Sequence, residues 1–455
     1  KKKAILEFKV EDAYFAELSK DEKQVLPLLN KAAKIIADIY LEQEKGSETY
    51  PGANLYPSEI TNDVVEKAAD KNLLILSPYT VVENSADGLI AIPYHIKYKQ
   101  FLEKITALLL EVSKISQNKA FSAYLKIAGE SLLSGDYEKM DKAWLKTDNS
   151  NLQFLIGPYE RYLDKRFFKK MAYMCFIGIK DSFYTKKAKE VTDVLLTTVG
   201  DKTHRYVRVS KIQVSTVRNT IFSGFLAKAF LSSEHIPSED EISREIGSRL
   251  IGYLSTMDTK FNKLLFPVFN AIFEKKFRQS YSKELLKRAN YYLMLVYALT
   301  ALLHRYEGSR ERLKELFPVF DEANSIVSGI QHCKHLVLKG VIDQKDLEAM
   351  IIMHLCLCFS EWVYAKNSKI RNDHLRGDAL ALGFYFQNQA LRELGGISWP
   401  NFSKIFFVIE NLSSFFVRHL SESTYSEADK FLRDNLSYEI FKSFDSKLAK
   451  IANSS

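Results

Sequence analysis

Cysteine is scarce in this chain and never occurs as a close pair. The 455 residues contain four cysteines, Cys175, Cys333, Cys356 and Cys358, and none of them forms a CxxC motif. A chain of this length would need many more cysteines for a disulfide framework, and a structural zinc ribbon would need paired ones. The cysteine usage therefore favours a reducing compartment. We expect a cytoplasmic protein, with a signal peptide removed before residue 1 left open.

Long apolar runs and a dominant charge sign are missing as well. The longest apolar run, 289–303, falls about five residues short of a membrane span and includes Asn290 and Thr300, so we expect a core helix and no membrane span. The 64 basic and 56 acidic residues are spread along the whole chain. The densest basic stretch, 273–288, also carries two glutamates, which is typical of a solvated helix face. We expect no nucleic-acid partner.

The sequence does have a large apolar and aromatic content arranged in two different patterns. Short segments rich in β-branched and aromatic residues occur at 72–84 and 88–98, within 151–181 and at 204–219, which predicts strands. From 257 onward the spacing of apolar residues predicts helices almost throughout. We therefore predict a predominantly helical α+β fold in two lobes separated by a cleft. The lobes are 1–255, with a mixed β-core, and 256–455, which is helical; the assignments of the helix near 184–199 and of the C-terminal segment stay open.

Eight segments also resemble a known family, in the same order along the chain. They are PGANLYP, SPYTVV, GLIAIPYHIKY, LLSGDYEKMDKAWL, IGPYERYLD, PSEDEISREIGSRLIGYLSTMDTKFNKLLFPV, RERLKELFPVFDEANS and LKGVIDQKDLEAM. Each is similar to a segment of the shorter, bacterial branch of the dipeptidyl peptidase III family of zinc metallopeptidases, and together they span roughly residues 7 to 435. The resemblance implies a lower lobe with a β-core, a helical upper lobe that carries zinc, and a cleft that holds peptides in extended form.

The family's zinc motifs are only partly present. Members hold zinc with two histidines of an H-E-x-x-H or H-E-x-x-x-H helix and a glutamate of E-E-x-x-A-[DE]. In this chain Glu322 falls on the glutamate ligand position, and Asp321 replaces the residue before it. The first motif should lie about 25 residues earlier, yet 292–308 contains only one histidine, His304, and lacks the motif's glutamate. We predict no catalytic residues and no bound metal, with large side chains such as Tyr297 filling the space.

Three further residues match the family's substrate contacts. Glu160 and Tyr162 match its E-x-Y motif, in which the carboxylate receives the amino terminus of the peptide and the phenol points at the scissile carbonyl. His374 matches a substrate-contacting histidine of the helical lobe. The structural alternative is that Glu160 closes a turn, that Tyr162 is a β-core aromatic and that His374 is merely exposed.

Three functions therefore remain in view. The leading hypothesis is a catalytically inactive dipeptidyl peptidase III-like protein that binds a peptide or a protein partner in its cleft and needs no cofactor. The second is an active hydrolase with zinc in a rearranged site around Glu322, His304 or a group formed by His332, His335, His354, Cys333, Cys356 and Cys358. Helical geometry turns His332 and His335 roughly 80° to 140° away from Glu322, which favours a structural role for that group. The third is a scaffold that acts through its outer surface.

Overall fold

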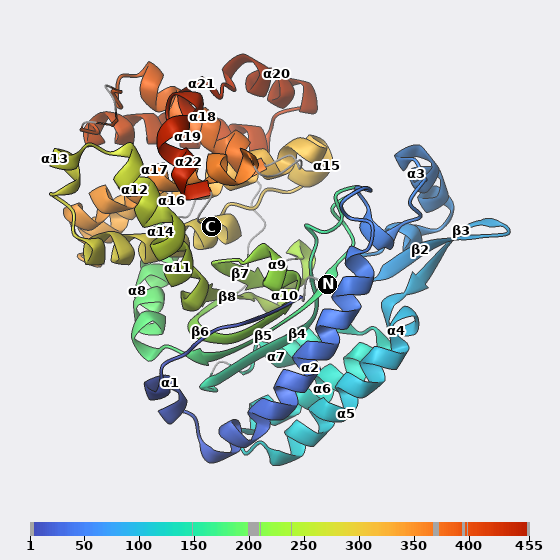
Figure 1. Cartoon of the computed structure of the whole chain (residues 1–455). Coiled ribbons are helices and arrows are strands. Elements are labelled where there is room, and N and C mark those ends of the chain that lie inside the picture. Colours follow the sequence, from blue (N-terminus) through green and yellow to red (C-terminus); the bar gives the residue numbers. More distant parts are fainter. Residues whose placement is uncertain are drawn as a thin grey trace. The chain divides into compact units, whose positions relative to one another are not determined.

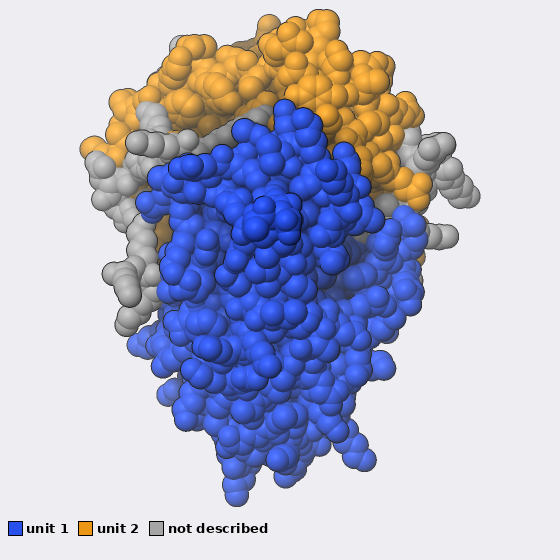
Figure 2. Space-filling model, turned by 90° about the vertical axis from the view of Figure 1, so that its right-hand side faces the viewer, with its two compact units in different colours: residues 1–185, 211–231, 236–255 blue, residues 186–210, 232–235, 256–455 orange. Residues whose placement is uncertain are grey.

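The computed structural model describes residues 4–147, 149–198, 209, 211–237, 239–366, 373–393, 396–397 and 399–452. It divides into two compact units, coloured separately in Figure 2. Unit 1 comprises 1–185, 211–231 and 236–255, and unit 2 comprises 186–210, 232–235 and 256–455. The C-terminal segment therefore groups with unit 2, as does most of the helix at 182–198. Each unit is described by itself.

Unit 1 is built on a six-stranded mixed sheet (Figure 1). Its strand order is β4-β5-β6-β8-β7, and β1 also pairs with β6. Neighbouring strands are antiparallel from β4 to β6 and between β1 and β6, whereas β6 and β8 are parallel. The strands are β1 (Ile5–Glu7), β4 (Leu152–Glu160), β5 (Ala172–Lys180), β6 (Ile212–Gly224), β7 (Ser233–Ile236) and β8 (Ser248–Tyr253).

The central strands are buried because their sequences are apolar on both faces. All residues of β4 and β5 except the last are buried, as expected of strands that are covered on both sides. Helix α2 packs against β5 and β6, and α5 packs against α2 and α6. The helices of unit 1 are α1 (Asp12–Ala16), α2 (Lys20–Glu44), α3 (Asn62–Lys71), α4 (Tyr94–Lys97), α5 (Lys99–Ile115), α6 (Lys119–Ser134), α7 (Tyr137–Trp144), α9 (Phe225–Ala229) and α10 (Asp240–Ile246).

A separate hairpin confirms one predicted strand pair and shortens it. β2 (Thr80–Ser85) and β3 (Gly88–Pro93) pair antiparallel, with Ser85 opposite Gly88 at the turn. The apolar residues before them do not extend the strand. Residues Leu73–Leu76 form a 3₁₀ helix in which the Asn72 side chain accepts a hydrogen bond from the Leu74 N–H. The prediction of a strand there was wrong because an apolar run without alternation fits either conformation.

Unit 2 is almost entirely helical, as the sequence predicts. Its helices are α11 (Leu254–Lys260), α12 (Phe266–Ile272), α13 (Lys275–Arg278), α14 (Lys283–Leu303), α15 (Ser309–Leu313), α16 (Phe317–Leu338), α17 (Gln344–Lys366), α18 (Asp373–Gln387), α19 (Phe402–Ser421), α20 (Tyr425–Asn435), α21 (Glu439–Ser443) and α22 (Asp445–Ala452). α8 (Ser182–Thr198), α11 and β7 cross the division between the units. Helix α16 is central, since it contacts α14, α17, α18 and α19.

One helix is long and apolar enough to raise the question of a membrane. Residues Gln344–Ala365 of α17 meet the length and hydropathy of a span, but 72% of the most apolar window is buried inside the structure. A helix that is apolar all round and packed on every side is typical of the core of a helical domain. Among the described residues, no other helix meets these two requirements.

Candidate functional site

Glu322 lies on the central helix of unit 2, where two neighbouring helices approach closely. A β-carbon added to Gly377 of α18 would lie 2.9 Å from the Ala323 Cβ, and one added to Gly329 of α16 would lie 3.2 Å from the Val296 carbonyl oxygen of α14. Glycine is therefore what allows α14 and α18 to come near α16. Side chains from both helices reach Glu322 as a result.

The first of these side chains is Tyr297 of α14, which belongs to the segment where the family's zinc motif is expected. Its hydroxyl donates a short hydrogen bond to Glu322 Oε2. Tyr297 therefore reaches the carboxylate from the position where a large side chain was expected. A phenol that hydrogen-bonds to a carboxylate occupies one of the oxygens that a metal ion would need.

The second side chain is His374 of α18, whose Nδ1 lies 3.5 Å from the same Glu322 oxygen. Burial acts to lower the pKa of the His374 imidazole. The carboxylates of Glu322, Glu361 and Asp378 outweigh that effect, so the pKa is raised above its ordinary value. His374 is therefore not an isolated exposed histidine. It lies in an acidic neighbourhood, and 48% of its side chain remains exposed.

His304 contacts Asn324 and His332. It lies at the end of α14, where its Nδ1 is 3.3 Å from the Asn324 amide nitrogen and its Nε2 is 3.0 Å from His332 Nε2. Burial, together with the neighbouring His304, lowers the pKa of His332 to about 3. The two imidazoles lie against each other, and His304 is buried. The rearranged site around Glu322 and His304 therefore lacks the geometry it would require.

The zinc site implied by the family does not fit the residues around Glu322. A catalytic zinc site has three protein ligands and keeps a position for water. Glu322 offers one carboxylate that already accepts from Tyr297, and His374 offers one imidazole. The part of the chain that the structure describes brings no third His, Cys or acidic ligand close enough to complete such a group with Glu322.

The group of histidines and cysteines proposed from the sequence is split by the structure. Cys333 donates to the carbonyl oxygen of Gly329 within its own helix. Cys358 instead donates to Asp378 Oδ1 at 3.4 Å, and His354 Nδ1 lies 3.8 Å from the Cys358 sulfur. Of the six residues, the structure thus brings His354 and Cys358 of α17 together, whereas Cys333 of α16 contacts its own helix.

Asp378 is the residue of this region that the sequence did not single out. Burial raises its pKa to about 7, and the charge of Glu361 adds to that effect. Burial also raises the pKa of the Cys358 thiol, so the thiol keeps its proton and donates it. One signal was available: Asp378 follows His374 by four residues, which places both on the same face of a helix.

Glu160 and Tyr162 lie in unit 1, at the end of β4. Glu160 Oε1 accepts from the backbone N–H groups of Arg161 at 2.7 Å and of Tyr162 at 3.3 Å, so its carboxylate does close a turn. Burial nevertheless raises the pKa of Glu160 to about 7, although the charges of Arg161 and Lys165 act in the opposite direction. The Tyr162 ring contacts Phe168 edge-on and is partly exposed.

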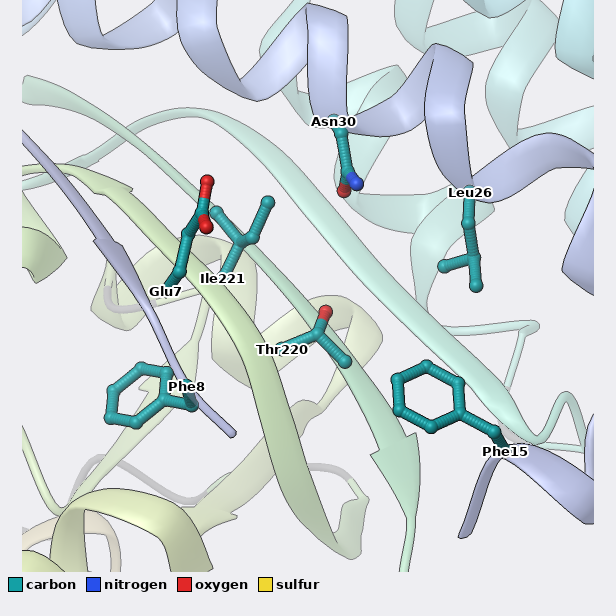
Figure 3. Close-up of a pocket in the computed structure, with 7 residues that line it drawn as sticks. All are labelled: Glu7, Phe8, Phe15, Leu26, Asn30, Thr220 and Ile221. Atoms are coloured by element: carbon teal, nitrogen blue, oxygen red, sulfur yellow. The ribbon is translucent and has the colours of Figure 1, made fainter. Parts of the chain in front are cut away.

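A different hollow of unit 1 contains none of the predicted site residues (Figure 3). Leu26 and Asn30 extend from α2 toward strands β1 and β6. The hollow is lined by Glu7, Phe8, Phe15, Leu26, Asn30, Thr220 and Ile221. Its lining is mixed and includes one exposed carboxylate, that of Glu7, without a cluster of reactive groups, so the lining indicates no particular reaction or ligand.

Comparison with solved structures defines the class of fold. No protein-family model matches the chain. The structure of dipeptidyl peptidase III from Caldithrix abyssi superposes with a TM-score of 0.83 and 20% identity, over 97% of this chain and 95% of that one. Dipeptidyl peptidase III from Corallococcus sp. strain EGB superposes with a TM-score of 0.85 and 20% identity, over 99% and 93%. The chain thus has an α+β, mostly helical peptidase fold.

More particularly, the fold is that of dipeptidyl peptidase III, as the eight sequence segments predict. Among curated proteins, Nudix hydrolase 3 of Arabidopsis thaliana is 23% identical over 400 residues, which cover 80% of this chain and 51% of that protein. The chain therefore spans about half the length of this relative.

Proposed function

We propose that this chain is a peptidase-related protein that binds peptides without hydrolysing them. The observation that carries the proposal is that other side chains contact the carboxylate of Glu322. Water becomes a nucleophile near neutral pH when a metal lowers its pKa, and a metal needs a set of free ligands. Here the carboxylate at the position that the resemblance assigns to zinc accepts a hydrogen bond from Tyr297, and the His374 imidazole lies beside it.

Glu160 would bind the amino terminus of the peptide. Partial burial raises the pKa of its carboxyl group to about 7, so ionisation is costly until a cation arrives. An α-ammonium group, with an ordinary pKa near 8, supplies that cation and forms a charge-assisted hydrogen bond. Affinity should therefore peak between about pH 7 and 8 and fall on acidification as Glu160 takes up a proton.

The edge of the sheet would hold the rest of the peptide through main-chain hydrogen bonds. One edge strand, β4, is already engaged, because the Phe154 carbonyl accepts from the Trp144 indole and the Leu152 N–H donates to Glu22. Strand β7 lies at the other end of the strand order, and three of its four residues are of intermediate burial. We therefore assign the peptide to β7.

The orientation of the peptide follows from a contact beyond β7. Glu239, three residues after that strand, lies 3.5 Å from the guanidinium group of Arg161, which is the neighbour of Glu160 in the chain. This contact joins the segment that follows β4 to the segment that follows β7. A peptide that pairs antiparallel to β7 would bring its amino terminus to the carboxyl end of that strand and to Glu160.

The test is fluorescence anisotropy with short synthetic peptides that carry a carboxyl-terminal dye and either a free or an acetylated amino terminus. The free peptide should bind at least about tenfold more tightly at pH 7.5, since one charge-assisted bond is worth 1.5 kcal/mol or more. Glu160→Gln should remove the preference while keeping the turn, and Glu130→Gln, an exposed acid of unit 1, should preserve it.

Two outcomes would contradict the proposal. Equal affinity for free and acetylated peptides would exclude Glu160 as the ammonium site. The scaffold function would be favoured instead if the chain bound no peptide but did bind a purified partner protein, and if that partner binding persisted when Glu160, Tyr162 and His374 were substituted together.

A further inference from the structure

Three side chains with metal-binding atoms converge inside unit 2, one helix turn along α18 from His374. His354 and Cys358 are four residues apart on α17 and therefore share one face of that helix. Asp378 projects toward them from α18. Their ligand atoms all lie within 4.8 Å of one another, and no other group of three His, Cys or acidic residues within the described ranges meets this condition.

The separations agree with the edges of a zinc coordination tetrahedron. Zinc bonds of about 2.3 Å to sulfur and about 2.0–2.2 Å to nitrogen or oxygen require ligand atoms about 3.3–3.6 Å apart. The Cys358 sulfur lies 3.4 Å from Asp378 Oδ1 and 3.8 Å from His354 Nδ1. The third separation, between the ligand atoms of His354 and Asp378, is within 4.8 Å, and rotation of these side chains would shorten it to bring all three onto one ion.

A second contact fixes the imidazole in the orientation that a ligand needs. His354 Nε2 lies 3.1 Å from the hydroxyl of Tyr385, a residue of α18 that is fully buried. Histidines that bind metals through one nitrogen usually donate the N–H of the other to a nearby oxygen. His354 Nε2 therefore hydrogen-bonds to Tyr385, and Nδ1, on the side of Cys358, is the nitrogen that would bind the metal.

Charge and burial limit the kind of ion. His354 and Cys358 are completely buried, and Asp378 is 9% exposed. A thiolate and a carboxylate together carry two negative charges, which a divalent cation neutralises, and buried charges are tolerated when they are compensated in this way. Sulfur, nitrogen and oxygen in one site suit zinc, whereas an all-oxygen site would suit magnesium or calcium.

We propose that His354 Nδ1, Cys358 Sγ and Asp378 bind one zinc ion, with water as the fourth ligand, and that the ion fastens α17 to α18. On binding, the thiol proton leaves to solvent, the hydrogen bond from Cys358 to Asp378 is lost, and a zinc–sulfur bond forms. This site is separate from the Glu322 position and independent of the peptide binding proposed above. No redox change takes place.

The experiment measures zinc by elemental analysis after loading and desalting of the full chain. The wild type should retain about one zinc per chain, and Co²⁺ in its place should give the absorption of a thiolate-bound cobalt ion near 300–350 nm. Cys358→Ser and Asp378→Asn should each lose at least about tenfold in affinity and lose the cobalt band, while circular dichroism reports whether they fold.

Two control variants locate the ion. Cys356→Ser changes a buried cysteine of the same helix that is outside the group, and it should retain zinc. Glu322→Gln should also retain it. The proposal would be overturned if the folded wild type held no zinc, or if folded Cys358→Ser kept both zinc and the cobalt band. It would also be overturned if Glu322→Gln lost its zinc, because the ion would then lie at the family's position.

Discussion

Two carboxylates of unit 2, Glu322 and Asp378, have neighbours of opposite chemical character. By resemblance Glu322 falls on the family's zinc-ligand position, and a phenol and an imidazole lie beside its carboxylate. Asp378 stands at no recognised position, yet a thiol faces it and an imidazole lies beside that thiol. The comparison shows that sequence similarity identifies which position corresponds to a ligand, whereas the neighbouring side chains determine whether that position can bind a metal.

Both neighbourhoods depend on how closely α18 packs on α16, so the largest effect should come from Gly377. Gly377→Val places methyl groups against Ala323 and the Val319 carbonyl oxygen and should lower the free energy of unfolding by about 3 kcal/mol, the upper range for overpacking. Chemical denaturation measures this. Gly383→Ala is the matched control, because nothing lies closer than 4.0 Å to its added carbon, and it should stabilise the helix by about 0.5–1 kcal/mol.

The second prediction tests whether the surroundings of Glu322 can be changed without affecting the proposed zinc site at Asp378. Tyr297→Phe removes the hydroxyl donor of Glu322 and should lower the free energy of unfolding by about 1–3 kcal/mol, because a buried carboxylate loses a partner. It should leave zinc retention unchanged. Tyr292→Phe, in the same helix, should change stability by less than about 0.5 kcal/mol, since its hydroxyl makes no hydrogen bond to the rest of the described chain. Equal effects of the two variants would count against a role for Tyr297.

The third prediction uses the raised pKa of Glu160. The carboxyl group ionises near 4.5 in the unfolded chain and near 7 in the folded one, so its contribution to stability is most favourable below pH 4.5 and declines as the pH rises to 7. Glu160→Gln keeps an acceptor oxygen but does not titrate. Relative to wild type it should gain of the order of 1 kcal/mol between pH 5 and pH 8. A pH-independent difference would refute the assignment.

The smallest effect should come from the pair of His374 and Glu322. The folded-state pKa of His374 is raised, so the contribution of the pair is fully present below about pH 6.5 and is lost as the pH rises through the folded value. Because nearly half of the imidazole is exposed, solvent screening should keep this below about 1 kcal/mol. Wild type and His374→Asn, compared by thermal denaturation with a metal chelator present, should converge above neutral pH.

Sequence reasoning succeeded where one segment determines its own structure. The apolar and aromatic residues within 151–181 predicted strands, which β4 and β5 confirm, although β4 continues through Gly157 and Pro158, two residues that usually interrupt a strand. The apolar residues around Tyr297 predicted a buried helix, as observed.

Sequence reasoning failed where two segments must meet. Nothing in the sequence reveals that Cys358 turns toward Asp378, because that contact depends on the rotation of α17 against α18. Sequence reasoning considered His354 and Cys358 as part of a larger metal-binding group and favoured a structural role for it, because nothing in the sequence brings Asp378 to them.

The most direct test of the central claim measures peptide binding and cleavage in the same zinc-loaded sample. Short peptides with a free amino terminus are titrated by anisotropy, and the mixture is then followed by mass spectrometry for release of an amino-terminal dipeptide. We predict saturable binding and intact peptide. Cleavage that Glu322→Gln abolishes would contradict the account and would show that the carboxylate beside Tyr297 still serves hydrolysis.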